Sequence, residues 1–396
     1  MRLGAVFMFN KNIFLLFLSQ GFNGAVISLL TFSSPLAGKW FVEQLNKHAG
    51  AFVLNFSTLA VSLTLCGAFI AVFFSSNIIY KLGRKKAFLW SAFVGVCGAL
   101  LAILALFQGS FWLFCLATFL LGFFTALNGF YRFLVNEALK NANQNHAYKA
   151  SALIVGGGIL GGVLGPNLAH FGLHLMHTPF VGSFIFVLIL CALNFLCTMF
   201  LELMPLPPKP KIKATLLECL KEPHFLRATL SCAVGFSLMI LMMNALPLSM
   251  AHYEPQEIKN VLMWHFIAMY APSLLLAFLV KKLNPFRLIV IGMIFYGIAG
   301  IVALMSQDFW GFLVSLIFVG IAWSLSFNGG TFLFNSIQSK NQVKLQELNA
   351  IAIFGANLMA SLSVGIILEN GGELVLNGIL LGSVCVFLVG FKFLKT

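Results

Sequence analysis

Long apolar runs are the feature of this sequence that most restricts its fold. A helix needs about 20 apolar residues to cross the hydrocarbon core of a bilayer, and runs of that length recur along the whole chain. Hydrophobic residues make up 60% of the 396 residues and charged residues only 9%, which is too little polar surface for a water-soluble domain of this size. The sequence therefore predicts an integral membrane protein of the all-α class.

Breaks at charged or Gly/Pro-rich stretches separate these runs into twelve predicted transmembrane helices. They cover residues 12–33, 52–79, 87–108, 111–136, 149–172, 179–202, 226–250, 257–280, 288–306, 309–334, 346–368 and 374–394. The basic N-terminal stretch is similar to a secretory signal, but its run is long and lacks a convincing cleavage site, so we interpret it as the first helix.

One stretch between the sixth and seventh runs has no long apolar segment. Residues 203–225 are rich in Pro and Lys, which predicts a solvated cytoplasmic linker that carries a short amphipathic helix. The chain then divides into an N-terminal half of six helices (1–202) and a C-terminal half of six helices (226–396).

Basic residues predict the orientation of the helices. All but four of the 24 Lys and Arg residues lie in the N-terminal segment, the even-numbered connections or the C-terminal tail, or at the span ends that border them; the exceptions are Lys39, Lys47, Lys259 and Arg132. Because Lys and Arg accumulate on the cytoplasmic side of membrane proteins, both termini are predicted to be cytoplasmic. The net charge of +13 is thus explained by topology, and no nucleic-acid partner is needed.

Two basic connections lie about half a chain apart, "YKLGRKKAF" after the second helix and "VKKLNPFRL" after the eighth. Two six-helix halves with such loops resemble the major facilitator superfamily over the whole chain. Gly83, Arg84 and Lys85 match that family's cytoplasmic loop motif, whereas Ser76 and Tyr80 replace its first glycine and its aspartate. The resemblance implies a monomeric carrier whose pathway lies between the two halves.

Motifs of enzymes and pumps are missing from the sequence. It contains no Gly-x-Ser-x-Gly turn, Walker loop or HExxH pair, so we expect neither an enzyme nor an ATP-driven pump. The eight cysteines form no CxxC pair and mostly lie inside apolar runs, which argues against a disulfide framework. A passive or secondary transporter of a small substrate, without a bound cofactor, remains.

Two pairs of soft ligands stand out in the seventh and eighth predicted helices. Met239 and Met243 are spaced i, i+4, and so are His265 and Met269, so each pair lies on one helix face. In an antiparallel hairpin both cross-pairs lie at equal depth, because both are symmetric about position 254. Thioethers with one imidazole suit Cu(I), and a histidine inside a membrane helix is costly and usually functional. The alternative is ordinary packing by methionine.

These motifs resemble one branch of the facilitators. The two pairs, with "ALPLSMA", "WHFIAMYAPSLLLAFLV", "GIAWSLSFNGGTFL" and "QELNAIAIFGANLMASLSVG", are similar to the CcoA-like copper importers of bacterial inner membranes. The resemblance implies import of copper for assembly of cbb₃-type cytochrome c oxidase, with metal binding by Met239, Met243, His265 and Met269. Relatives in that branch carry riboflavin, so an importer of riboflavin or another small organic molecule is the alternative. Drug efflux is third, because "GGGILGGVLGPNLA" partly resembles an antiporter signature.

Two further groups are candidate sites. His170, His174 and His177 at the outer end of the fifth helix form a candidate capture site for copper, although polar residues at a helix end are usually interfacial. Glu137, near Arg132 at the inner end of the fourth helix, is a candidate for proton handling. The alternative there is a salt bridge that steadies the helix end.

Overall fold

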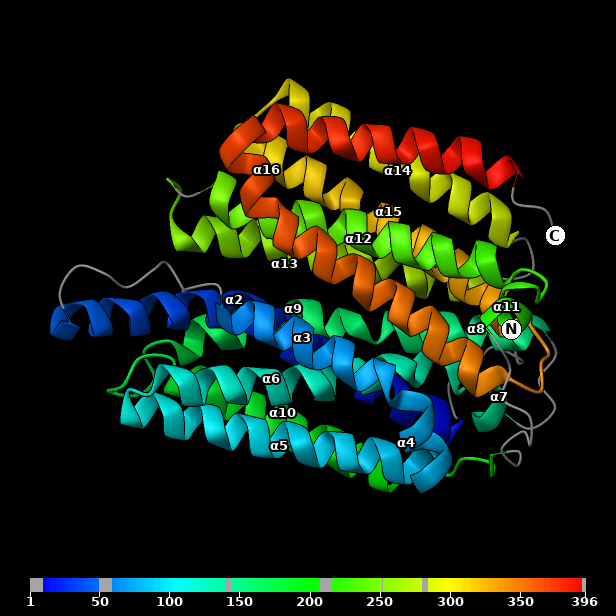
Figure 1. Ribbon diagram of the computed structural model, residues 1–396, viewed down its shortest axis with the longest axis horizontal. Coiled ribbons are helices and arrows are strands. Elements are labelled where there is room, and N and C mark those ends of the chain that lie inside the picture. Colours follow the sequence, from blue (N-terminus) through cyan, green and yellow to red (C-terminus); the bar gives the residue numbers. More distant parts are fainter. Residues whose placement is uncertain are drawn as a thin grey trace. The chain divides into compact units, whose positions relative to one another are not determined.

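The computed structural model of the chain describes residues 10–49, 59–139, 144–206, 216–250, 252–279 and 284–393. Within these ranges all regular elements are helices (Figure 1). They are α2 (Lys11–Ala49), α3 (Leu59–Phe73), α4 (Ser75–Leu82), α5 (Arg84–Gln108), α6 (Phe111–Asn128), the 3₁₀ helix η2 (Gly129–Phe133), α7 (Val135–Ala138), α8 (Gln144–Gly156), α9 (Gly158–Gly172), α10 (Val181–Met199), α11 (Leu216–Leu220), α12 (Phe225–Ser249), α13 (Pro255–Leu279), α14 (Pro285–Met305), α15 (Phe309–Asn335) and α16 (Gln342–Phe393).

The helices account for each of the twelve predicted membrane spans. In the described ranges, ten helices are long and apolar enough to cross a membrane, and the bent pair of α3 and α4 adds one more. α16 counts as one of the ten, but its backbone leaves the helical region at Gly372, where φ is 61°. Its two arms, orange and red in Figure 1, meet there at a sharp bend and correspond to the eleventh and twelfth spans. The chain is therefore a multi-pass membrane protein.

Several spans differ from the predicted ones in detail. α2 continues past residue 33 to Ala49, because Pro35 inside it does not end the helix; a proline removes one backbone hydrogen bond, which membrane helices tolerate when neighbours compensate. The fourth span ends in η2 and α7, and the fifth is two helices, α8 and α9. In the linker, α11 occupies residues 216–220, and residues 207–215 lie outside the described ranges.

The basic loop motif forms a tight turn. Gly83 lies between α4 and α5 with φ of 78°, a conformation that side chains with a Cβ rarely adopt, so glycine is required there. Arg84 begins α5 and is buried, and Lys85 follows it in the first turn.

The chain divides into two compact units. The first comprises Met1–Tyr131 and Leu160–Leu206, and the second comprises Arg132–Ile159 and Pro207–Thr396. The boundary passes through the fourth and fifth spans, because α8 packs against α13 and α15 of the second unit.

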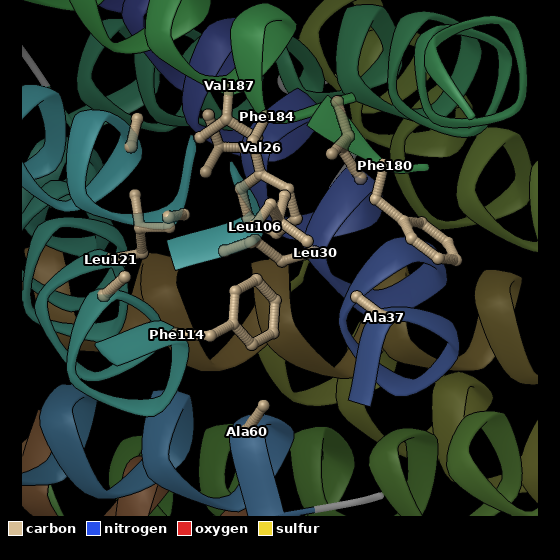
Figure 2. Close-up of a cluster of buried hydrophobic side chains, with 14 of the residues drawn as sticks. Val26, Leu30, Ala37, Ala60, Leu106, Phe114, Leu121, Phe180, Phe184 and Val187 are labelled. Carbon is tan, nitrogen blue, oxygen red and sulfur yellow. The ribbon is translucent and has the colours of Figure 1, made fainter. Parts of the chain in front are cut away.

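In the first unit, small residues let helices pack closely beside an apolar core. α3 and α6 approach closely where Gly67 faces the backbone of Phe119 and Gly122 faces the backbone of Thr64, so neither glycine has space for a side chain. α2, α5, α6 and α10 enclose an apolar core, in which Leu30, Phe114 and Phe184 are buried (Figure 2). Such close approach by small residues is the usual basis of helix packing in membranes.

α15 holds the second unit together. α12, α13 and α14 all pack against it, and it approaches each of them at a glycine. A Cβ on Gly320 would lie 2.7 Å from the carbonyl oxygen of His265 in α13, and a Cβ on Gly330 would lie 2.6 Å from Sγ of Cys232 in α12. α12 and α13 make few direct contacts with each other. The predicted direct packing of the seventh and eighth spans is therefore wrong for most of their length, because both helices pack against α15 instead.

Candidate functional site

The four predicted copper ligands are all inside the second unit. Met239 and Met243 on α12 are 2% and 5% exposed, and His265 and Met269 on α13 are 0% and 2% exposed. None of the four side chains therefore faces lipid. Their helices meet mainly through α15, so these side chains are not joined by a direct α12–α13 interface.

His265 has one ring nitrogen bound and one unbound. Its Nδ1 lies 2.8 Å from the carbonyl oxygen of Leu316 in α15. A carbonyl only accepts hydrogen bonds, so Nδ1 carries the proton and Nε2 carries the lone pair. Nε2 is buried and has no hydrogen-bond partner in the described chain. Metal-binding histidines commonly have this arrangement, in which the second ring nitrogen donates to a backbone carbonyl.

Metal sites built from His, Cys, Asp and Glu are not formed in the described ranges. In the described ranges no three His, Cys, Asp or Glu side chains are placed to hold a metal ion together. His170 lies in the last turn of α9, whereas His174 and His177 follow the end of that helix. All three imidazoles are exposed. The structure thus does not gather these three histidines into a metal-holding group.

Arg132 is buried in the second unit and bound by neutral groups. Its Nη1 donates to Oγ1 of Thr331 at 2.7 Å and to Sγ of Cys232 at 3.7 Å, and its Nη2 donates to Oδ1 of Asn349 at 2.8 Å. Glu137 lies in α7 and is partly buried, and it is not among the acceptors described for Arg132.

An aromatic cluster, which the sequence reasoning missed, joins three helices of the second unit. It consists of Phe236 on α12, Tyr270 on α13, and Trp323 and Phe327 on α15. The rings of Trp323 and Phe327 are stacked, with centroids 4.7 Å apart and planes 16° apart. Phe236 and Tyr270 each meet Trp323 edge-on, with centroids 5.4 Å from it. The i, i+4 spacing of Trp323 and Phe327 was the one available signal in the sequence.

Two buried polar atoms in or next to the aromatic cluster have no hydrogen-bond partner among the described residues. Nδ2 of Asn328 donates to Oγ of Ser273 and to the carbonyl oxygen of Ser324, both at 2.7 Å, which links α13 to α15. Oδ1 of Asn328 and Nε1 of Trp323 are buried and have no hydrogen-bond partner in the described chain. Buried polar atoms without partners are costly, so an acceptor and a donor are available here for a ligand. Of the four rings, only that of Phe236 is partly exposed.

Known proteins resemble the chain over most of its length. The riboflavin transporter RfnT of Brucella anthropi is 27% identical over 343 residues, which cover 84% of this chain and 85% of that protein. Among solved structures, the human organic anion transporter MFSD10 (TETRAN) matches 97% of this chain and 99% of its own, with a TM-score of 0.69 and 15% identity. The transporter FucP in the outward conformation matches 95% of this chain and 98% of its own, with a TM-score of 0.68 and 12% identity.

The two structural matches agree with the helical fold, and the sequence match extends across both halves of the chain. The family model of the Major Facilitator Superfamily matches residues 13–367. With its two compact units and its membrane helices, this chain belongs to the Major Facilitator Superfamily of transporters.

Proposed function

We propose that this transporter imports a planar aromatic molecule of the flavin type, with riboflavin as the first candidate. The aromatic cluster is the observation that carries this proposal. A flavin ring is flat and has a polar edge of donors and acceptors, which matches stacked aromatic rings beside the unused atoms Trp323 Nε1 and Asn328 Oδ1. The similarity to a protein named as a riboflavin transporter, over 84% of this chain, supports the same substrate class.

The test is rescue of a riboflavin-auxotrophic bacterium by expression of the protein, together with uptake of labelled riboflavin. Replacing Trp323 by Leu removes the central ring of the cluster, and uptake at low external riboflavin should fall about tenfold, since stacking of a flat ring on an aromatic side chain is worth about 1–3 kcal/mol. Trp323→Phe keeps an aromatic ring and should retain most of the uptake.

A matched control is present on α13. Trp264 is 49% exposed, so Trp264→Leu removes the same side chain from the surface and should leave uptake unchanged. If the wild-type protein neither rescues growth nor accumulates riboflavin, the flavin proposal is wrong. Equal losses in the two Leu variants would assign the effect to folding rather than to the cluster.

Copper is the second candidate, because one observation favours it specifically. The buried His265 presents an unbound Nε2 while its Nδ1 is held by the carbonyl of Leu316, and Met269 lies one turn further along α13. An imidazole lone pair with thioethers is a soft donor set that suits Cu(I). In this function the copper ion is the substrate, and it is carried rather than retained.

The same cells separate the two candidates when copper uptake is measured beside riboflavin uptake. Met243→Leu and His265→Leu remove a soft lone pair with little change in volume. Copper uptake should fall sharply in both, while Met242→Leu, which changes a buried methionine one position away, should have no effect. Equal copper uptake in all three variants would mean that Met243 and His265 do not bind copper and only pack in the protein interior.

A further inference from the structure

Arg132 is a buried cation that has only neutral partners. The side chain is 5% exposed, and its three described hydrogen bonds go to a hydroxyl, an amide oxygen and a thiol. These acceptors come from α15, α16 and α12, and Asn349 is itself held by Thr229 of α12 at 3.1 Å. The guanidinium is therefore fixed in position within the second unit.

In the described ranges, no carboxylate is among the groups described as bound to this guanidinium. All eleven acidic residues lie in the described ranges, and none of them is an acceptor described for Arg132. A buried charge without a counter-charge is costly, and a neutral residue of similar volume would serve packing at least as well. The described bonds also use only three of the five N–H donors of the guanidinium. A bound anion would supply the counter-charge that the described partners of Arg132 do not.

The guanidinium lies at one end of the aromatic cluster. Its Cζ is 4.2 Å from the ring centroid of Phe327 and 4.4 Å from that of Phe133. Phe327 stacks in turn on Trp323. Along α15, Thr331, which accepts from Arg132, lies two turns or about 12 Å beyond Trp323. A ring bound at Trp323 would thus reach Arg132 through a chain of several atoms that ends in the charged group.

We propose that this site prefers planar aromatic anions, with the ring at the aromatic cluster and a carboxylate or phosphate at Arg132. The inference rests on the proposed function for the aromatic ring, and Arg132 adds the preference for negative charge. Arginine suits this role because its planar fork pairs with carboxylate and phosphate oxygens through two parallel hydrogen bonds.

Calorimetric titration of the purified full-length protein in detergent tests the preference with two pairs of probes. Flavin mononucleotide is compared with riboflavin, and 5-(2-naphthyl)pentanoate with 5-(2-naphthyl)pentanol, so that each pair differs mainly in charge and each charged group lies on a chain of several atoms. The wild-type protein should bind each anion about tenfold more tightly than its neutral counterpart, as expected for a charge-assisted hydrogen bond. Arg132→Gln should abolish that difference, and Arg132→Lys, which keeps the charge, should retain part of it.

Arg227 on α12 provides the matched control. It also lies over aromatic rings, 5.3 Å from the centroid of Phe286 and 5.8 Å from that of Phe391, and it is apart from the aromatic cluster. Arg227→Gln should leave the anion preference intact. If the wild-type protein binds the anionic and the neutral probe of each pair equally, the inference is wrong, and Arg132 only holds α12, α15 and α16 together. If the protein prefers naphthylpentanoate to naphthylpentanol but binds neither flavin, the charge preference stands and the flavin proposal fails.

Discussion

Asp308, the single aspartate of the chain, shows how one residue sets a helix boundary. It precedes α15, and its Oδ1 accepts hydrogen bonds from the backbone N–H of Gly311 at 2.7 Å and from Oγ of Ser306 at 2.6 Å. These bonds hold the pKa of the Asp308 carboxyl below its usual value, because they favour the charged form. The carboxylate therefore stabilises the fold above its ordinary pKa of about 3.9, and this contribution is lost as the pH falls through the lower pKa of the folded state. Asp308→Asn should melt at a lower temperature than wild type near neutral pH, and the difference should shrink below about pH 4. Thermal unfolding of both purified proteins across this pH range measures the difference in melting temperature. If that difference stays constant down to about pH 3, Asp308 stabilises the start of α15 by hydrogen bonding alone, and its charge does not contribute.

At the scale of elements, glycines decide which helices are neighbours. Gly320 lets α15 approach α13, and an added Cβ would meet the carbonyl of His265 and the Cβ of Ala268, at 2.7 and 2.9 Å. Because one of these contacts is backbone, Gly320→Ala should push the helices apart and cost about 1–3 kcal/mol of stability. Gly297→Ala is the control, since Gly297 in α14 has nothing within 4 Å of an added Cβ. The thermal midpoints of the two variants should therefore differ clearly, with only Gly320→Ala below wild type. Similar midpoints would mean that α13 can move without cost, and then the position of His265 would not depend on α15.

For the whole molecule, the distribution of Lys and Arg predicts the topology. Reporter fusions test it directly, since green fluorescent protein is fluorescent only when it stays inside and alkaline phosphatase is active only outside. Fluorescence is expected for fusions in the 203–225 linker and at the C-terminus, and phosphatase activity for a fusion at His252, between α12 and α13. The reverse pattern at all three sites would contradict the predicted orientation. A mixed pattern would contradict the number of spans between the sites.

The sequence by itself determined the features that depend on local composition. The length and polarity of each run follow from the thickness of the bilayer core, so the twelve spans, the linker region and the family were all predictable from residues near one another in the chain. The burial of His265 was predictable for the same reason, because an imidazole inside an apolar span avoids lipid. Tertiary structure alone decided which residues meet. The three acceptors of Arg132 lie 100, 199 and 217 positions away along the chain, so no pattern of neighbouring residues in the sequence indicates them. In the same way α15 packs against both α12 and α13 because its glycines permit close approach, and it thereby assembles the aromatic cluster from three helices. Helix formation is a property of neighbouring residues, whereas the choice of neighbouring helix depends on the shapes of complete surfaces, which a linear sequence does not display.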